Sequence, residues 1–260
     1  LKGVDLYNNI WYYIRVKGTR KLLKEKTKMD KRKTYYIGID TETCNGRIDV
    51  DGKLNLTDSL VYDIGWMVVD KKGNVYESRS FMVEEIFCGM SDLMETCYYN
   101  EKLPRYYEEL DNGTRKLAPL RLIRWLLVQD MKKYNINIVF AHNARFDYRA
   151  LNNTLRYLTK SEYRYFFPYG TNIWDTQAMA RDTIAKQKTY QAFCFKNGYV
   201  TKHKKPRVRL TAEILYRYIT MDTTFIESHT GLEDVLIEKE IFARCMRQHK
   251  KMKKSIFKES

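Results

Sequence analysis

Apolar runs separated by turns predict the strands of this chain. The runs at 34–40, 59–70 and 74–84 follow one another closely, and the last two are joined by "DKKGN", a turn of the hairpin kind. Three consecutive strands with short connections predict an antiparallel meander. Two shorter apolar runs, at 136–141 and 171–174, predict two further strands and bring the sheet to five.

Apolar residues at helical spacing lie between and after these runs. The segment 119–135 is amphipathic, with Pro119 suited to the first helical turn, and it leads into the strand at 136–141. A helical crossover between strands implies parallel pairing. Further helices are predicted at 145–160, 175–188, 211–219 and 230–248. The pattern therefore predicts one α/β domain over 34–248, a mixed five-stranded sheet flanked by helices.

Both ends of the chain are basic. Residues 1–33 are predicted to form a basic helical arm and linker, interpreted equally well as a solvated connector or as an arm that binds nucleic acid. Residues 249–260 are predicted to be a disordered basic tail. Over the whole chain, 47 Lys and Arg residues outnumber 32 Asp and Glu residues, which gives a net charge of +15. Such a charge attracts polyanions, so nucleic acid is the first partner to consider, with a generally soluble basic surface as the alternative.

The segment 187–209 adds a third basic region. It places five Lys or Arg residues between 202 and 209, directly after several aromatic residues. Aromatic rings that stack bases beside cations that bind phosphates are typical of a grip on a single strand. A packed insertion with a solvated basic tip is the alternative.

Cysteine usage and hydropathy indicate the compartment. The five cysteines have no C-x-x-C spacing, which favours reduced thiols in a cytosolic protein. No stretch approaches 18 consecutive apolar residues, and no secretion signal is recognisable. We therefore expect no membrane partner and a cytoplasmic location, which is the host cytoplasm if the chain is viral.

Two acidic motifs follow predicted strands. Asp40 and Glu42 are two positions apart, so on a strand they project from one side while Thr41 points to the other. Asp147, in "NIVFAHNARFDYRAL", lies near the start of a predicted helix, where a bare carboxylate needs a partner. A solvent-facing strand end is the alternative for the pair, and a simple helix terminus is the alternative for Asp147.

A third motif is "SHTGLEDVLIEKEIF". Thr230 and Glu233 fit a capping box, which makes His229 the residue before the N-cap and Asp234 the fourth helical residue. These two positions pack against each other in a capped helix, so His229 is expected beside a carboxylate that raises its pKa. A satisfied surface histidine is the alternative. Four acids and one histidine are the ingredients of a two-metal hydrolytic site, in which hard divalent ions bind oxygen and a histidine accepts a proton from water.

Taken together, the three motifs resemble those of the DEDDh (DnaQ-like) family of 3'-to-5' exonucleases. "IGIDTET" is similar to the first family motif, "AHNARFD" to the second and "HTGLED" to the third, whose H-x(4)-D spacing marks the histidine subclass. The resemblance covers about residues 34–245. It implies a ribonuclease H-like fold and two divalent metal ions, Mg²⁺ or Mn²⁺.

The resemblance also implies roles for single residues. Four acids are implied as metal ligands: Asp40, Glu42, Asp147 and Asp234. The first three would hold one ion, Asp40 and Asp234 would hold the other, and His229 would be the general base. The implied substrate contacts are the backbone around two strand residues and two side chains at the second motif: Thr43, Cys44, Asn143 and Phe146. The loop after Glu42, "TCNGRID", departs from the Thr-Thr-Gly that family members often carry.

The activity implied is removal of nucleoside monophosphates from 3' ends, with single-stranded DNA as the preferred substrate. Alternatives are an RNA-directed or structure-specific nuclease of the same family, and a catalytically silent nucleic-acid-binding module. The silent module is disfavoured because no implied ligand or base is missing. The chain has no polymerase, helicase or P-loop pattern, which fits a standalone nuclease or a polymerase accessory with a replication partner. Compact chains rich in Lys and Tyr resemble phage-encoded exonucleases.

Overall fold

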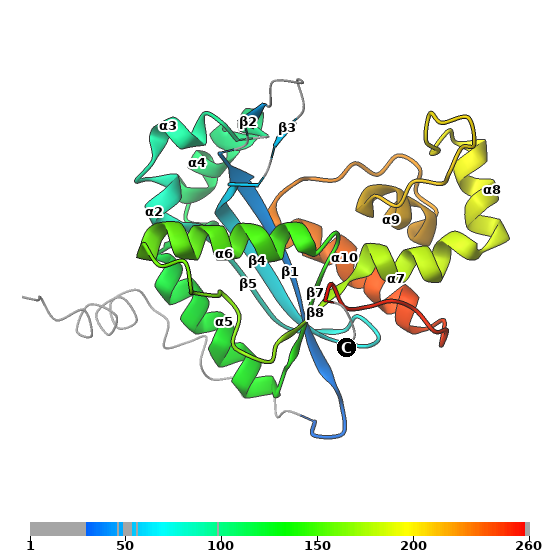
Figure 1. The fold of residues 1–260 in the computed structure, drawn as a ribbon, viewed down its shortest axis with the longest axis horizontal. Coiled ribbons are helices and arrows are strands. Elements are labelled where there is room, and N and C mark those ends of the chain that lie inside the picture. Colours follow the sequence, from blue (N-terminus) through cyan, green and yellow to red (C-terminus); the bar gives the residue numbers. More distant parts are fainter. Residues whose placement is uncertain (1–29, 46, 49–53, 56, 98, 258–260) are drawn as a thin grey trace, which may run out of the picture. The chain divides into compact units, whose positions relative to one another are not determined.

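The computed structural model describes residues 30–45, 47–48, 54–55, 57–97 and 99–257. Contacts within the chain separate two units, Leu1–Arg32 and Lys33–Ser260. Most of the predicted basic arm lies outside the described residues. The second unit contains all the motifs identified above, and its fold is shown in Figure 1.

A six-stranded mixed sheet forms the centre of this unit, in the order β6-β5-β4-β1-β7-β8. Its strands are β1 (Tyr35–Cys44), β4 (Leu60–Asp70), β5 (Val75–Val83), β6 (Leu117–Ala118), β7 (Ile138–Ala141) and β8 (Asn172–Asp175). β1, β4 and β5 form the predicted antiparallel meander, and β7 pairs in parallel with β1 as the crossover requires. Two short strands, β2 (Arg47–Ile48) and β3 (Leu54–Asn55), make a separate antiparallel ribbon.

The predicted number of five strands was wrong because of β6. Leu117 and Ala118 pair in parallel with Met82 and Val83 and add a sixth strand at the edge of the sheet. A strand of two residues is too short to show an alternating pattern, so it left no signal in the sequence.

Helices cover both faces of the sheet. α10 (Gly231–Met246) packs on the face that carries Gly38 and Gly65, because a Cβ at Gly38 would lie 3.2 Å from Val235 and a Cβ at Gly65 would lie 2.2 Å from the backbone of Leu232. α5 (Leu120–Tyr134) packs on the opposite face, where its Asp130 accepts a hydrogen bond from Trp66 at 3.0 Å. α6 (Arg145–Thr159) lies beside it in front of the sheet in Figure 1. Burial on both faces explains why every residue of β4 is buried.

Several predicted helices begin and end close to the expected residues. α5, α6, α9 (Ala212–Thr220) and α10 match four predicted segments, with Pro119 immediately before α5 rather than inside it. The single helix predicted at 175–188 is instead α7 (Thr176–Asp182), η2 (Ile184–Lys186) and α8 (Lys188–Lys196). The first break falls at Thr183, whose hydroxyl donates to the Met179 carbonyl at 2.7 Å. A threonine bond of this kind bends a helix, and periodicity does not reveal it.

Four short helices between β5 and β6 were not predicted. They are α2 (Glu84–Phe87), α3 (Ser91–Met94), η1 (Asn100–Lys102) and α4 (Leu103–Asp111). None of the helices in the described part of the chain is both long and apolar enough to cross a membrane.

Most aromatic residues of segment 187–209 pack into the hydrophobic core of the protein. The Tyr190 ring is fully buried, and its hydroxyl donates to the Arg209 carbonyl at 2.5 Å. Phe193 packs on both Tyr190 and Tyr199. Phe195 is exposed. These contacts favour the packed insertion over the single-strand grip for most of the aromatic residues.

Residues 254–256, near the C-terminus, are attached to the sheet. The Asp175 amide donates to the Lys254 carbonyl at 2.8 Å, and the Ile256 amide donates to the Ile173 carbonyl at 3.0 Å, so residues 254–256 lie along the outer edge of β8. Ile256 is buried. The prediction of a disordered tail was therefore wrong for these residues. The segment is basic overall, but it contains one apolar residue, Ile256, that packs into the protein.

Candidate active site

β1 carries the first two carboxylates. Asp40 lies opposite Gly65 and Glu42 lies opposite Asp63 in the pairing with β4, so both acids are on the face covered by α10. The strand continues to Cys44, with a register shift after Glu42. Glu42 is 9% exposed, which excludes a solvent-facing strand end as its explanation.

Asp147 approaches the pair from α6, where it is the third helical residue and 3% exposed. The Thr41 hydroxyl donates to Asp147 Oδ1 at 2.8 Å. The Thr41 side chain points away from the face of Asp40 and Glu42, as predicted. On that other side it contacts Asp147. Burial raises the pKa of Asp147 to about 7, and the hydrogen bond from Thr41 opposes that rise.

α10 supplies the third motif, and its start is fixed against β4. The Gly231 amide donates to Asp63 Oδ2 at 3.1 Å. Gly65 and Gly231 permit this approach, since a Cβ at Gly65 would lie 2.2 Å from the Leu232 nitrogen and a Cβ at Gly231 would lie 2.8 Å from the Gly65 nitrogen. Because α10 starts here, the residues around its N-terminus lie next to Asp40 and Glu42.

Thr230 is the N-cap of α10, at the predicted position. The predicted capping-box bond was wrong, since the Thr230 hydroxyl donates to Glu233 Oε2 at 2.9 Å instead of accepting from the backbone. Glu233 also accepts from Arg105 at 2.9 Å. The Glu233 carboxylate, which the sequence predicts to cap the start of α10, is therefore bound by Arg105 of α4 as well.

His229 and Asp234 meet as expected. His229 Nδ1 lies 3.9 Å from Asp234 Oδ2. One ligand atom each from Glu42, His229 and Asp234 can be chosen so that all lie within 4.8 Å of one another. Glu42 thus forms one cluster with two residues that are 187 and 192 positions further along the chain.

The pKa of His229 shifts in the direction opposite to the prediction. Burial lowers it most, and the positive charge of Lys102 lowers it further, while Glu213 and Glu101 raise it. Lys102 is fixed nearby because its ammonium group donates to the Ser228 carbonyl. An imidazole with a lowered pKa is neutral near pH 7 and can accept a proton.

The negative charges of the carboxylates in this site repel one another. Burial raises the pKa of Asp40 well above its ordinary value, and the charges of Asp147, Glu238, Asp234 and Glu42 raise it further. Burial and the charge of Asp234 likewise raise the pKa of Glu42. The pKa of Asp234 is raised to about 8, again mainly by burial. Mutual repulsion in a buried cluster is relieved when a cation binds.

Glu238 is a fifth carboxylate that sequence reasoning missed. It lies one helical turn after Asp234 and is 2% exposed. Its Oε1 accepts from the His142 amide at 2.9 Å, while its Oε2 has no hydrogen-bond partner among the described residues. The only sequence signal was the spacing of four from Asp234, which places both acids on one side of the helix. A buried carboxylate oxygen without a partner, among oxygen donors with raised pKa values, fits a site for hard divalent cations.

The four implied substrate-contact residues flank this cluster. Thr43 and Cys44 follow Glu42 on β1 and are buried, and the Cys44 thiol donates to the Leu60 carbonyl at 3.6 Å. Asn143 is exposed, and its amide donates to Asp175 Oδ1 at 3.0 Å. Phe146 is partly buried at the start of α6. Their roles toward a substrate stay predictions.

Comparison with known proteins finds similarity in structure alone. No protein-family model and no curated protein matches the chain. The nuclease domain of 3'hExo, a DEDDh family member solved with rAMP, matches with a TM-score of 0.52 at 14% identity, over 87% of this chain and 100% of that one. Cell-death related nuclease 4 (CRN-4) matches with a TM-score of 0.51 at 12% identity, over 84% of this chain and 65% of that one. The chain has the ribonuclease H-like fold of these nucleases.

Tyr99 makes a contact in the site that could not be foreseen from the sequence. Its ring stacks on the imidazole of His229, with centroids 4.1 Å apart and planes 12° apart. We expect Tyr99→Ala to reduce turnover about tenfold because the imidazole loses one wall that fixes its orientation. Tyr99→Phe, which keeps the ring, should restore turnover. Steady-state hydrolysis of a labelled oligonucleotide measures both variants, and equal losses in the two would contradict a positioning role.

Proposed function

We propose that the chain is a divalent-metal-dependent 3'-to-5' exonuclease that releases nucleoside monophosphates, with single-stranded DNA as its preferred substrate. One observation carries the proposal. Acids from β1, α6 and α10, all buried except the half-buried Asp40, approach one another with raised pKa values, beside a histidine whose pKa is lowered. The net charge of +15 supports a polyanionic substrate.

The acids would hold two ions, Mg²⁺ or Mn²⁺. Asp40, Glu42 and Asp147 would bind one of them, and Asp40 with Asp234 would bind the other. When bound, such ions act as Lewis acids that stabilise charge on a phosphoryl group. Thr41 orients Asp147 through its 2.8 Å hydrogen bond, so α6 is linked to β1 at the point where the ligands meet.

The remaining residues would position water and nucleotide. His229, as neutral imidazole, would accept the proton of the attacking water, and Tyr99 holds the plane of its ring. The positive charge of Lys102 lies close enough to lower the pKa values of Glu42 and Asp234 as well. The backbone at Thr43 and Cys44 would pack on the terminal nucleotide, with Phe146 near a base and Asn143 near a phosphate.

RNA is the second candidate substrate. The nuclease domain of 3'hExo, which shares the fold, was solved with the ribonucleotide rAMP. A catalytically silent binding module is a weaker candidate, because all five residues implied in the chemistry are present. As a setting we infer cytoplasmic action, alone or with a replication polymerase, and a phage origin for a compact chain of this composition.

A product ladder tests the proposal. Single-stranded and duplex DNA and RNA, labelled at the 5' end, are incubated with Mg²⁺, with Mn²⁺ or with excess chelator. We expect labelled products that shorten one nucleotide at a time, most rapidly for single-stranded DNA, and no cleavage in chelator. Cleavage that persists in chelator, or a labelled mononucleotide as the first product, would exclude the proposal. Salt-dependent binding without turnover would favour the silent module.

Glu238 provides a prediction about the proposed metal site. Glu238→Gln keeps an oxygen for the His142 amide but removes a buried negative charge. We expect the metal-free variant to unfold at a higher temperature than the unmodified protein, and its affinity for Mn²⁺ to fall by about 10- to 100-fold. Thermal unfolding with and without Mn²⁺ and calorimetric titration measure the two effects. Glu240→Gln on the same helix is the control, and unchanged Mn²⁺ affinity in Glu238→Gln would contradict a role in the site.

A further inference from the structure

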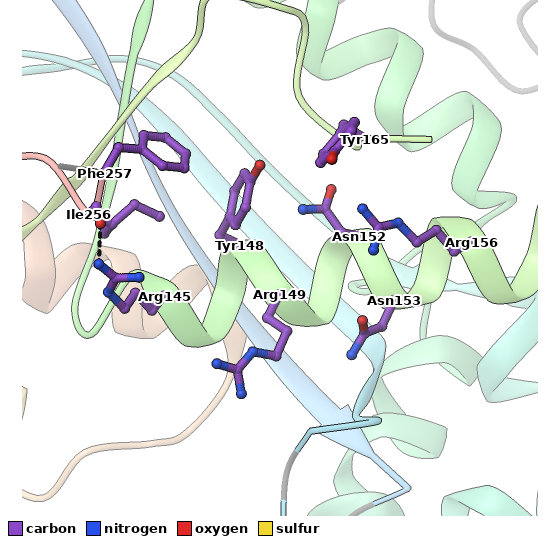
Figure 2. A pocket seen from close by; sticks show the side chains of 9 residues that line it. All are labelled: Arg145, Tyr148, Arg149, Asn152, Asn153, Arg156, Tyr165, Ile256 and Phe257. Atoms are coloured by element: carbon purple, nitrogen blue, oxygen red, sulfur yellow. Dashed lines mark hydrogen bonds between the residues drawn. The ribbon is translucent and has the colours of Figure 1, made fainter. Parts of the chain in front are cut away.

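A second site lies on the opposite side of α6 from Asp147. A cavity of about 220 Å³ lies beside this helix. The described residues that line it, drawn in Figure 2, include Arg145, Arg149 and Arg156 but no acidic residue. At about 100° per residue, these three arginines fall on one side of the helix and Asp147 falls on the other. The cavity, called here the α6 pocket, is therefore separate from the carboxylate cluster.

The arginines of the α6 pocket keep their positive charge uncompensated. Arg145 donates to the Ile256 carbonyl, and Arg156 Nε donates to the Arg164 carbonyl at 3.0 Å. Within the described residues, no carboxylate lies in ion-pair range of any of the three. Each guanidinium offers five N–H groups in a planar fork that matches a phosphate, so donors remain for an anion.

Exposed aromatic rings accompany these cations. Tyr165 lines the pocket with 55% of its surface exposed, and the Arg156 guanidinium lies 4.9 Å from its ring centroid. Three more tyrosines of the same region are exposed: Tyr157, Tyr163 and Tyr169. An acidic peptide would require only the cations. Flat rings in solvent beside arginines are suited to stacking bases, which favours nucleic acid.

We propose that the α6 pocket binds the backbone phosphates of a single-stranded nucleic acid, with one base stacked on Tyr165. The inference rests on the proposed function, because the bound strand is the one whose 3' end would be hydrolysed. The cavity is smaller than the roughly 300 Å³ at which pockets for drug-sized ligands begin, so it holds about one nucleotide. Arg145 and Arg156 are about 16 Å apart along the helix, a span that reaches neighbouring phosphates.

Binding of a fluorescent 20-nucleotide oligo(dT) in chelator tests this site, because it requires no hydrolysis. Arg149 is the residue to replace, since no hydrogen bond of its side chain supports the fold in the described part of the chain. We expect Arg149→Gln to reduce the slope of log affinity against log salt concentration by about 0.7, the value for one phosphate contact on a single strand. Tyr165→Ala should weaken binding about fivefold or more, while Tyr165→Phe should not.

Lys72→Gln is the matched control, because Lys72 is an exposed cation in the β4–β5 turn. It removes one charge and should leave the slope unchanged. Binding by Arg149→Gln that equals the unmodified protein at every salt concentration would overturn the proposal. Displacement of the oligonucleotide by polyglutamate at equal charge concentration would also overturn it, in favour of a general surface for acidic proteins. If the slope falls for Arg149→Gln but no substrate is hydrolysed, the α6 pocket stands and the proposed function fails.

Discussion

Replacing His229 by asparagine should reduce hydrolysis at the 3' end by about 10²- to 10⁴-fold, the contribution of a positioned general base. The pKa of His229 is lowered by burial and by Lys102, so its imidazole is ready to accept a proton at neutral pH. Asparagine is the chosen replacement because His229 has a left-handed backbone (φ 53°), a conformation that asparagine tolerates better than most residues. The first-order rate of product release under saturating Mg²⁺ measures the effect.

The fold and metal binding should survive this change, since the variant keeps all the carboxylates. His203→Ala is the matched control, because His203 is an exposed histidine in segment 187–209 and does not belong to the cluster of Glu42, His229 and Asp234. Full activity in His229→Asn would exclude this residue as the base. Asp147→Ala should abolish activity too, but through weaker Mn²⁺ binding, which a calorimetric titration separates from the His229 effect.

Replacing Gly65 by alanine should lower the free energy of unfolding by about 3 kcal/mol or more, at the upper end of the range for an overpacked core. The new Cβ would lie 2.2 to 2.5 Å from backbone atoms of Gly231 and Leu232. Backbone cannot move aside as a side chain can, so α10 must shift away from β4. Such a shift also breaks the bond from the Gly231 amide to Asp63 and moves Asp234 relative to Glu42. Urea unfolding followed by circular dichroism measures the loss.

Gly170→Ala is the comparison for this prediction. A Cβ there meets nothing within 4 Å, but the backbone is left-handed (φ +82°), so the expected cost is about 1 to 2 kcal/mol. If Gly65→Ala costs no more than Gly170→Ala, the close approach of β4 and α10 is not as tight as described.

Sequence patterns located the acids and the histidine because each motif adjoins a strongly patterned element. Asp40 and Glu42 lie on an apolar strand, Asp147 at the start of an amphipathic helix and Asp234 just after a capping signal. The neighbours of these residues were missed where they come from elements without periodicity. Lys102 belongs to η1, which has three residues. The pKa of His229 was predicted in the wrong direction because only the local pair with Asp234 was considered.

The fold, too, was predicted well where an element has a clear apolar pattern and poorly where it has none. β4 and β5 were predicted close to their observed bounds, whereas the strand predicted at 34–40 continues as β1 to Cys44. β6 and the attachment of residues 254–256 depend on backbone pairing with distant segments, which local sequence does not encode. Glu238 was missed for a related reason, since nothing in the helix pattern distinguishes a buried glutamate from an exposed one until α10 is placed against β1.

Residues 254–256 have a consequence for self-association. An uncovered edge strand invites pairing with another molecule, and here this segment covers the outer edge of β8 at one end of the sheet. Ile256 and Phe257 also form one wall of the α6 pocket. A protease that cut ahead of Lys254 would therefore do two things at once, exposing β8 to aggregation and dismantling the arginine site.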